Sequence, residues 1–549
     1  MSEKIFALID LINNFLLSVP MLVGLLMTGL LFTVWSGFSQ YRSLTHGVAL
    51  IRGKGGVDVS EGPGALTHFQ ALTAALSGTV GLGAIAGMAI AVELGGPGAI
   101  FWMWTIGIVG MALKSTEVTL ALLYRDVSDP KNPHGGTMFV ARNAIGGTTG
   151  KIIGTAFALA LLLFAFTGGN MFQTWSAADT TREYFGVPPW VSGLIIATLA
   201  GIVIVGGISR IGNVTKTLVP FKCGLYVLAG LYVILQHASA LPDLMKLIFT
   251  SAFSATEGVG AFTGASFGAA FMFGMKRALF SSESGLGTAP IAHSAVKTPE
   301  PVTEGVVAGL EPFIDTIFVC TVTGLVILCT GLWNRPPALK FDVPPAIVKV
   351  ADGQWQPQPL IFKGSEQLKV GAPVFMVLTT PEGRVRNYGT VDSAPEVAAD
   401  ALKVNWRSIK SPTRPDVAES GLFADYRGAT LVAKSFDSVH EGLGRWLITV
   451  AVWVFSLSTL ISYGYYAEQA VIFLGGAKHI LPLRLLWCAA AALACAGWLK
   501  TSEQLDAISS IGMGFMFAIN LPMMLFLGHR AMWAWHDYFR RRALKLAQG

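Results

Sequence analysis

Residues 71–87 read ALTAALSGTVGLGAIAG, an apolar stretch suited to the inside of a membrane helix but interrupted by glycines at positions 78, 81, 83 and 87. Each mid-helix glycine costs about 1 kcal/mol of helix propensity relative to alanine. Non-helical backbone is tolerated at membrane depth only where protein or a water-filled cavity satisfies the freed amide and carbonyl groups. The stretch therefore predicts a discontinuous membrane helix beside a cavity.

A second interrupted stretch, residues 258–296, is too long for one straight span at 1.5 Å of rise per residue. It contains Phe273-Gly274, then Lys276-Arg277, Glu283 and the sequence GLG at 285–287, which together predict a break. Two interrupted helices in corresponding halves of a chain indicate the substrate site of a transporter built from inverted repeats. Close helix packing at glycine is the alternative for either helix alone.

The composition places the whole chain in a membrane. Of its 549 residues 52% are apolar and 13% are charged, whereas a soluble domain has about 25% charged residues. This low charged fraction excludes a soluble enzyme. A nucleic-acid-binding protein is also excluded, since much of the net charge of +6 lies in a C-terminal run typical of a membrane flank. The five cysteines all lie in apolar stretches and indicate neither a disulfide framework nor a metal site.

A bilayer core requires about 20 apolar helical residues, and about eleven stretches satisfy this length. They are residues 14–38, 66–92, 97–123, 151–178, 189–207, 215–237, 259–290, 303–333, 443–473, 480–499 and 504–528. Basic residues follow the first, third, fifth and eleventh stretches, so all four loops share one side. Because basic loops face the cytoplasm, we expect an outside N-terminus and a cytoplasmic C-terminus in a bacterial-type inner membrane.

Residues 335–440 interrupt the membrane pattern with many charged residues and prolines. Their segments 368–380, 384–391 and 430–436 are rich in β-branched residues, with glycine and proline between them, which predicts strands and turns. We expect a small β-rich insert outside the membrane that is dispensable for transport and has an unknown partner or role. A disordered loop is the alternative, although Val, Phe, Trp and Leu are frequent for one.

Several motifs of the membrane part follow a recognisable order. They include GGPGAIFWMW at 95–104, Lys114 with Glu117, Gly169-Asn170-Met171, the run from Gly274 to Gly287, Asp315-Thr316 and Ser458-Thr459. In these residues the sequence resembles the alanine or glycine:cation symporter family. The resemblance implies an all-α polytopic protein with a leucine-transporter-like 5+5 inverted repeat of the APC superfamily, plus one extra N-terminal helix. It also implies symport of a small neutral amino acid with a cation, without a cofactor and without enzymatic activity.

The first break is the expected substrate site. A helix half that begins beyond a break offers free amides and a positive dipole, which suit a carboxylate. We expect the carboxylate to meet the backbone of Gly81 and Gly83 near Thr79. The other candidate substrate-binding residues are Gln70, Asn170, Gln173, Phe273 and Gly274. Ordinary interhelical hydrogen bonding is the alternative for Asn170 and Gln173.

The coupling cation is expected to be a single Na⁺. One conceivable position, beside the substrate, would need an oxygen ligand at position 84, where the family pattern has Asn and this chain has Ala84. The other position would use carbonyls near Thr79 and Val80 with the hydroxyls of Ser458 and Thr459. Proton coupling is the alternative, because Asp315 and Asp506 are available as buried acids.

Lys276, Arg277 and Glu283 are expected to follow the second break and to form a cytoplasmic gate. The predicted function is import of a small neutral amino acid, such as alanine or glycine, by alternating access across the lipid bilayer. A membrane sensor that has lost transport, with a ligand-binding insert, is the alternative from another class. A channel is less favoured, because no ring of charged or carbonyl-rich filter sequence is present.

Overall fold

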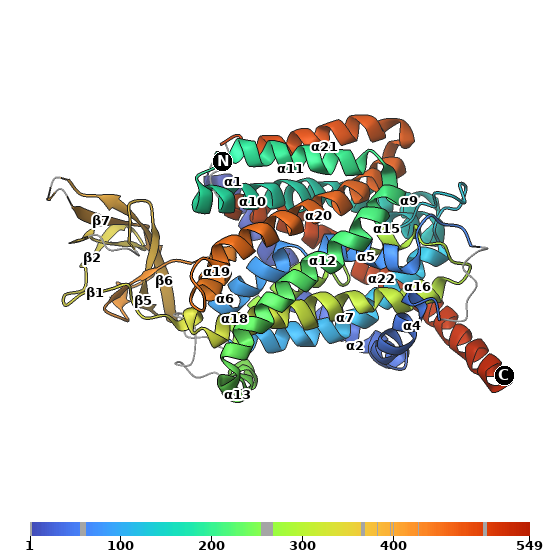
Figure 1. Cartoon of the computed structure of the whole chain (residues 1–549), viewed down its shortest axis with the longest axis horizontal. Coiled ribbons are helices and arrows are strands. Elements are labelled where there is room, and N and C mark those ends of the chain that lie inside the picture. The colour runs from blue at the N-terminus through green and yellow to red at the C-terminus, as the bar shows by residue number, and fades with distance from the viewer. Residues whose placement is uncertain are drawn as a thin grey trace.

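The computed structural model describes residues 3–54, 62–253, 267–363, 368–381, 383–395, 397–398, 400–426, 428–497 and 502–548. The chain is a bundle of long helices with a sheet-rich insert at one end (Figure 1). The helices of the first half are α1 (Glu3–Leu16), α2 (Val19–Trp35), α3 (Ser39–Arg42), α4 (Val48–Ile51), α5 (His68–Thr79), α6 (Met88–Gly95), α7 (Gly98–Leu123), α8 (Thr137–Val140), α9 (Gly147–Phe164), α10 (Phe172–Phe185), α11 (Pro189–Ile204) and α12 (Gly207–Gln236).

The second half is built from shorter pieces and then from long helices again. Its helices are α13 (Leu241–Phe253), α14 (Phe267–Ser282), α15 (Ala289–His293), α16 (Pro301–Ala308), α17 (Leu310–Pro312), α18 (Cys320–Cys329), α19 (Ala429–Asp437), α20 (Leu443–Gly475), α21 (Ile480–Ala494) and α22 (Ser502–Gln548). A short π-helical segment, Phe313–Val319, joins α17 to α18, so that Pro301–Cys329 forms one span.

Within the described residues, eight helices are long and apolar enough to cross a membrane, and nine spans result when the bent pair α5 and α6 is counted as one. The expected fifth span corresponds to α11, which is apolar but shorter, with 16 residues. The expected seventh span begins in residues 254–266, which lie outside the described part of the chain. The remaining nine expected spans therefore coincide with those that the structure provides.

Both breaks in the helices exist, but the second lies further along the chain than the sequence predicted. Helix α5 ends at Thr79 and its continuation from Gly83 to Gly95 is bent by 53°. Helix α14 continues through Phe273 and Gly274 and ends at Ser282; the break follows, with positive φ at Glu283, Gly285 and Gly287. Lys276 and Arg277 therefore precede the break instead of following it.

The insert consists of two antiparallel sheets. The larger sheet has the strand order β1-β10-β5-β6-β7-β4 with β9 also paired to β5, and the smaller has the order β2-β3-β8. The strands are β1 (Leu339–Lys340), β2 (Ile347–Ala351), β3 (Gln354–Pro357), β4 (Leu360–Lys363), β5 (Pro373–Thr380), β6 (Gly383–Ser393), β7 (Ala401–Trp406), β8 (Ile409–Lys410), β9 (Asp416–Val417) and β10 (Gly421–Ala424). A separate apolar core, including Val374, Met376 and Trp406, fills the insert.

One strand prediction in this region is wrong. Residues 430–436 lie in helix α19, because Val432 and Phe436 are one helical turn apart and bury a common face. Leu431, Val432 and Phe436 belong to the core of the helical bundle and not to that of the insert. The sheets therefore end at Ala424, and the chain rejoins the membrane core from α19 onward.

The insert and the C-terminus lie at opposite ends of the helical bundle, and the N-terminus lies at the end near the insert (Figure 1). The loop parity predicts the same relative arrangement, and the side of the membrane on which each end lies stays a prediction. Strands β1 and β10, which begin and end the insert, pair with each other through Leu339 and Leu422. The two connections between the insert and the bundle therefore run side by side.

Candidate functional site

The broken span α5–α6 forms the centre of the site. At its break the amide of Gly81 bonds to the carbonyl of Thr79 at 2.8 Å, and the amide of Ala84 bonds to that of Gly81 at 3.2 Å. A π-helical turn from Gly83 to Gly87 then continues into α6. The first amides of a helix have no partner within it and carry a partial positive charge. The break thus presents donors suited to an anion.

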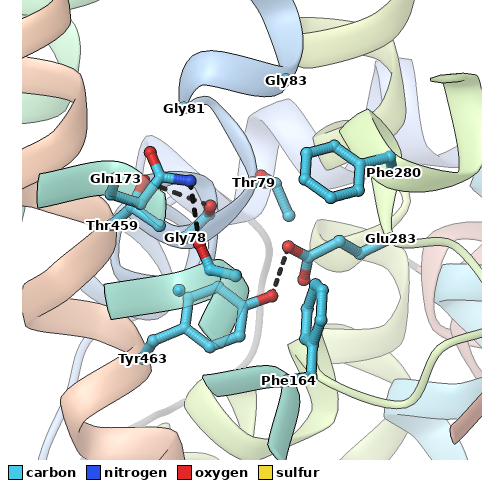
Figure 2. A pocket seen from close by; sticks show the side chains of 12 residues that line it. Gly78, Thr79, Gly81, Gly83, Phe164, Gln173, Phe280, Glu283, Thr459 and Tyr463 are labelled. Carbon is cyan, nitrogen blue, oxygen red and sulfur yellow. Dashed lines mark hydrogen bonds between the residues drawn. The ribbon is translucent and has the colours of Figure 1, made fainter. Parts of the chain in front are cut away.

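A small cavity lies against this break (Figure 2). It measures about 20 Å³, which is room for about one water molecule. Its lining comes from four helical regions that are distant in sequence, and consists of Gly78, Thr79, Gly81, Gly83, Phe164, Gly168, Gly169, Gln173, Phe280, Glu283, Thr459 and Tyr463. Of the predicted substrate-binding residues, Thr79, Gly81, Gly83 and Gln173 therefore meet around one cavity.

Glu283 supplies the carboxylate of this cavity. It is the first residue of the second break, with a φ of 51° that L residues rarely adopt. Tyr463 of α20 donates a hydrogen bond to one carboxylate oxygen (Figure 2). Thr288 donates to the other at 2.6 Å. The strained backbone thus directs Glu283 toward the first break.

Two of the predicted polar partners behave differently. Gln173 lines the cavity; its amide nitrogen donates to the carbonyl of Gly168 at 3.2 Å, and its buried Oε1 has no hydrogen-bond partner. Asn170 donates instead to the carbonyl of Trp487 at 2.8 Å, which ties two helices together. Gln173 therefore offers a free acceptor to a bound molecule. Asn170 makes an ordinary interhelical hydrogen bond, which was the alternative to a role in substrate binding.

Three other predicted residues lie apart from the cavity lining. Gln70 closes a capping box with Thr67 at the start of α5 and donates to Asn213 at 3.0 Å. Phe273 packs near Gly95, and Gly274 allows α14 to approach α7, since an added Cβ would lie 2.6 Å from the carbonyl oxygen of Ala99. The aromatic side chain of α14 that does line the cavity is Phe280, two turns further along.

The residues predicted to bind a cation are brought together between α5 and α20. The hydroxyls of Ser458 and Thr459 each lie 3.2 Å from the carbonyl oxygen of Ser77, and the carbonyl of Val80 points to the same region. A residue that sequence analysis missed also lies there. The Nζ atom of Lys222, from α12, is 2.5 Å from the Val80 carbonyl and 2.5 Å from the Ser458 hydroxyl.

The charges predicted for a gate or for proton transfer lie in separate places. Arg277 pairs with Asp506 at 3.5 Å, with both side chains partly exposed. Asp315 is fully buried and accepts hydrogen bonds from Ser281 at 2.5 Å and from Thr316 at 3.1 Å. Lys276 is partly buried and lies on α14 beside Arg277. Only Glu283 of this group reaches the cavity.

A buried ionic network was also not predicted. Glu304 of α16 accepts hydrogen bonds from His68 of α5 and from His293 of α15, and His293 also bonds to Glu311 at 2.6 Å. Lys114 lies 3.4 Å from Glu311 and 3.9 Å from Glu117. Lys114 and Glu117 are one helical turn apart, but the other partners are separated by 11 or more positions, so local spacing does not reveal the rest of the network. No cluster suited to a metal ion occurs among the residues that the structure describes.

The profile of the sodium:alanine symporter family matches residues 2–359 and 416–548. The chain belongs to this family. The unmatched residues 360–415 fall inside the insert, so the family's match covers both broken spans, α12 and α20. The resemblance seen in the motifs is thereby confirmed, and this family member is a transporter, not an enzyme.

Two relatives of this chain agree with the family match. The chain is 43% identical to the sodium/alanine symporter AgcS of Methanococcus maripaludis over 60% of this chain and 72% of AgcS. It is 29% identical to YrbD of Bacillus subtilis, a putative sodium/proton-dependent alanine carrier protein, over 97% of this chain and 92% of YrbD. Together with the family match, these relatives identify the chain as a cation-coupled amino-acid symporter that spans the membrane several times.

The fold is that of leucine-transporter-like proteins, as expected. The structure of MhsT in complex with L-phenylalanine aligns with a TM-score of 0.52 at 13% identity, over 86% of this chain and 92% of that chain. The family member thus has the 5+5 inverted repeat with a broken helix beginning each half, one additional N-terminal helix and the small sheet region of the insert.

Proposed function

We propose that the chain imports a small neutral amino acid, such as alanine or glycine, together with a monovalent cation by alternating access. The observation that supports this proposal is the cavity at the first break, where glycine backbone, the free Oε1 of Gln173 and the Glu283 carboxylate meet. The substrate carboxylate would take the amide of Gly83 and, once its bond to the Thr79 carbonyl is exchanged, that of Gly81, and the substrate ammonium would take Gln173 or Glu283. A buried zwitterion needs such donors and acceptors at both ends.

The walls of the cavity favour a small side chain. Phe164 and Phe280 stand on either side of Glu283, and Tyr463 closes the cavity against Gly169, where an added Cβ would lie 2.4 Å from the Tyr463 ring (Figure 2). Because the cavity has room for about one water molecule, even glycine or alanine enters only when these rings move. Each additional carbon requires a larger movement, so we expect uptake to fall from alanine to leucine.

The cation has two candidates. Na⁺ remains the prediction from the hydroxyls of Ser458 and Thr459, and the names of both relatives contain sodium. A specific observation favours the second candidate, a proton, because the ammonium of Lys222 already contacts the carbonyl and hydroxyl that Na⁺ would use. We propose an inner-membrane location with the insert outside, in keeping with the basic loops on the other side.

The test is uptake by proteoliposomes that contain the purified full chain. Labelled alanine, glycine, serine and leucine are supplied in turn with an inward Na⁺ gradient, an inward H⁺ gradient, both or neither. Accumulation of alanine or glycine against its gradient supports the proposal. Absence of exchange for every amino acid tested would instead favour a sensor that does not transport.

The role of the insert is tested in the same vesicles. Because β1 and β10 are paired, a short Gly-Ser linker can replace residues 339–423. Arg386 of the insert donates a hydrogen bond to the carboxylate of Glu93 in α6, so the same variant carries Glu93→Gln to avoid leaving a buried carboxylate without that partner. Uptake within about twofold of the unmodified chain is expected for an insert outside the transport pathway. Complete loss of transport with retained folding would indicate that the insert is part of the pathway.

A further inference from the structure

An apolar groove lies between α10 and α20, which run side by side in the bundle (Figure 1). Its volume is about 350 Å³, within the range of sites that hold small molecules. It shares no lining residue with the cavity at the first break. The groove is lined by Thr181, Phe185, Val187, Trp446, Thr449, Val450, Trp453 and Val454.

The lining presents only apolar surface, because its two hydroxyls are satisfied within the protein. The hydroxyl of Thr181 donates to the carbonyl of Ala177 at 2.7 Å and accepts from the indole nitrogen of Trp453 at 2.7 Å. The hydroxyl of Thr449 donates to the carbonyl of Arg445 at 2.7 Å. A polar ligand would lose its hydrogen bonds to water here without gaining others, so the groove suits a hydrocarbon chain.

The groove begins where two membrane spans end. Phe185 is the last residue of the span Gly147–Phe185, and Trp446 lies in the first turn of the span Leu443–Gly475. Trp446 is 62% exposed, and tryptophan is enriched at the boundary between membrane and water. From Trp446 to Val454 the groove follows one face of α20 for about 12 Å into the span, at 1.5 Å per residue. Because membrane helices are tilted by only about 20° on average, the groove runs nearly parallel to the lipid chains.

Arg445 places a positive charge at the mouth of the groove. Its side chain is exposed, and its guanidinium lies 4.6 Å from the centre of the Phe185 ring, which lines the groove. The neighbouring acids have other partners. Asp437 accepts hydrogen bonds from the first backbone amides of α20, and Glu183 accepts one from Thr430 at 3.4 Å. Among the described residues no ion pair includes Arg445, so its guanidinium is available to an anion at the level of the lipid headgroups.

A lipid chain fits this groove better than a helix of a second copy does. Helices that associate in membranes approach each other through small residues such as Gly, Ala and Ser. The groove is bordered instead by the large rings of Phe185, Trp446 and Trp453, which leave a narrow hollow between them. In a symmetric dimer formed through the groove, the two copies of Arg445 would also face each other, and like charges repel.

We propose that the groove binds an anionic phospholipid, with one acyl chain between Trp446 and Trp453 and the phosphate beside Arg445. The proposal goes beyond the proposed function, because it concerns a lipid that is bound and not transported. The groove lies between two helices that also line the cavity at the first break, α10 through Gln173 and α20 through Thr459. A chain in the groove fills the space between these helices and stabilises their packing.

The first measurement is native mass spectrometry of the purified full chain in detergent. Phosphatidylglycerol, which is anionic, and phosphatidylcholine with the same acyl chains are added in turn. One basic residue near the headgroups is worth about a fivefold difference in affinity, so we expect about fivefold more retained phosphatidylglycerol than phosphatidylcholine. Equal retention of the two lipids would overturn the proposal, as would a dimer of the chain that carries no lipid.

Two variants separate the groove from its mouth. Val450→Trp fills the groove from a position that is 43% exposed, and Leu228→Trp is its control on α12, where the side chain is 70% exposed. We expect Val450→Trp to retain about fivefold less of either lipid, and Leu228→Trp to behave as wild type. Arg445→Gln is expected to retain both lipids equally, whereas Lys246→Gln, an exposed position on α13, keeps the preference for phosphatidylglycerol. Undiminished retention of phosphatidylglycerol in Val450→Trp would overturn the proposal.

The second measurement is the midpoint of thermal unfolding in detergent with and without added phosphatidylglycerol, because a bound ligand stabilises the state that binds it. We expect the lipid to raise the midpoint of the wild type and of Leu228→Trp, and to leave that of Val450→Trp unchanged. An equal rise in Val450→Trp would show that the lipid acts at another place and would overturn the proposal. Neither measurement uses transport, so both results are independent of the proposed function.

Discussion

Arg386 of strand β6 donates hydrogen bonds to both the carboxylate and the main-chain carbonyl of Glu93, which lies near the end of helix α6. The two side chains are almost completely buried, with exposed fractions of 1% for Arg386 and 6% for Glu93. The insert is therefore attached directly to α6, the second half of the broken span. Any tilt of α6 during transport must move the insert or break this contact.

We predict that Arg386→Ala lowers the free energy of unfolding by about 3 kcal/mol, because it leaves the buried Glu93 carboxylate without its charged partner. The matched control is Arg384→Ala on the same strand, whose guanidinium lies 3.5 Å from Glu419 with both side chains about two-fifths exposed. That exposed pair is worth about 0.5 kcal/mol or less. Thermal unfolding followed by size-exclusion chromatography compares the two variants; equal losses would contradict the buried contact.

Gly83→Val is predicted to reduce amino-acid binding more than tenfold. Even a Cβ at Gly83 would lie 3.3 Å from the Phe280 ring and 3.4 Å from the Cα of Ser281, so the two further methyl groups would fill the cavity. Gly224→Val is the control, because nothing lies within 4 Å of its added Cβ in another membrane helix. Isothermal titration with alanine measures the affinity of both variants. An unchanged affinity in Gly83→Val would show that the substrate binds at another place.

Gln173→Ala is predicted to weaken alanine binding about 10- to 100-fold, the value of about 1.5–3 kcal/mol for a hydrogen bond to a charged group. Gln173 lines the cavity and its buried Oε1 has no hydrogen-bond partner, whereas Gln70 completes a capping box away from the cavity. Gln70→Ala should accordingly lower stability by about 1 kcal/mol and leave the alanine affinity unchanged. The opposite pattern of affinities would restore Gln70 to the substrate site.

Glu304→Gln is predicted to destabilise the chain by about 2 kcal/mol. Each carboxylate oxygen of Glu304 bonds to a different histidine, so an amide in its place retains one acceptor and loses the other. Glu300→Gln is the control, since Glu300 pairs at the surface with Arg541 at 2.9 Å. The thermal unfolding midpoints of the two variants are measured side by side. A larger decrease of the midpoint in Glu300→Gln would show that the buried network does not stabilise the fold.

Local sequence predicted the first break well, because the glycines around Gly81 act on the helix that contains them. The second break was placed too early, since Phe273-Gly274 looks like an interruption but Gly274 only allows close packing on α7. The true break starts at Glu283, a residue whose left-handed backbone has no sequence signature. Helix α19 was mistaken for a strand because β-branched residues suit both states, and burial against the bundle decided between them.

The residues on the first break were predicted from backbone conformation, and Gln173 and Thr459 were the predicted residues from other helices that also line the cavity. Thr79, Gly81 and Gly83 lie on the break itself, whereas Phe280 and Tyr463 reach the cavity through packing between distant helices. Lys222 had a signal that sequence analysis did not use, since it is the single lysine within the apolar residues 217–237. Its contact with Val80, 142 positions away, follows only from the fold.

Several contacts between α5 and α20 are serine hydroxyls that bond to carbonyls of the neighbouring helix. Ser77 bonds to the carbonyl of Ser458 at 2.7 Å, and Ser462 bonds to that of Ala74 at 2.8 Å. Each such bond contributes about 1 kcal/mol net, and a serine in a helix has a carbonyl of its own preceding turn as a second acceptor. Ser458 has that second acceptor within reach, at 2.8 Å in Phe455. When α5 and α20 shift past each other, a serine that loses its acceptor on the other helix can therefore bond to a carbonyl of its own helix, so that no buried hydroxyl loses its hydrogen bond.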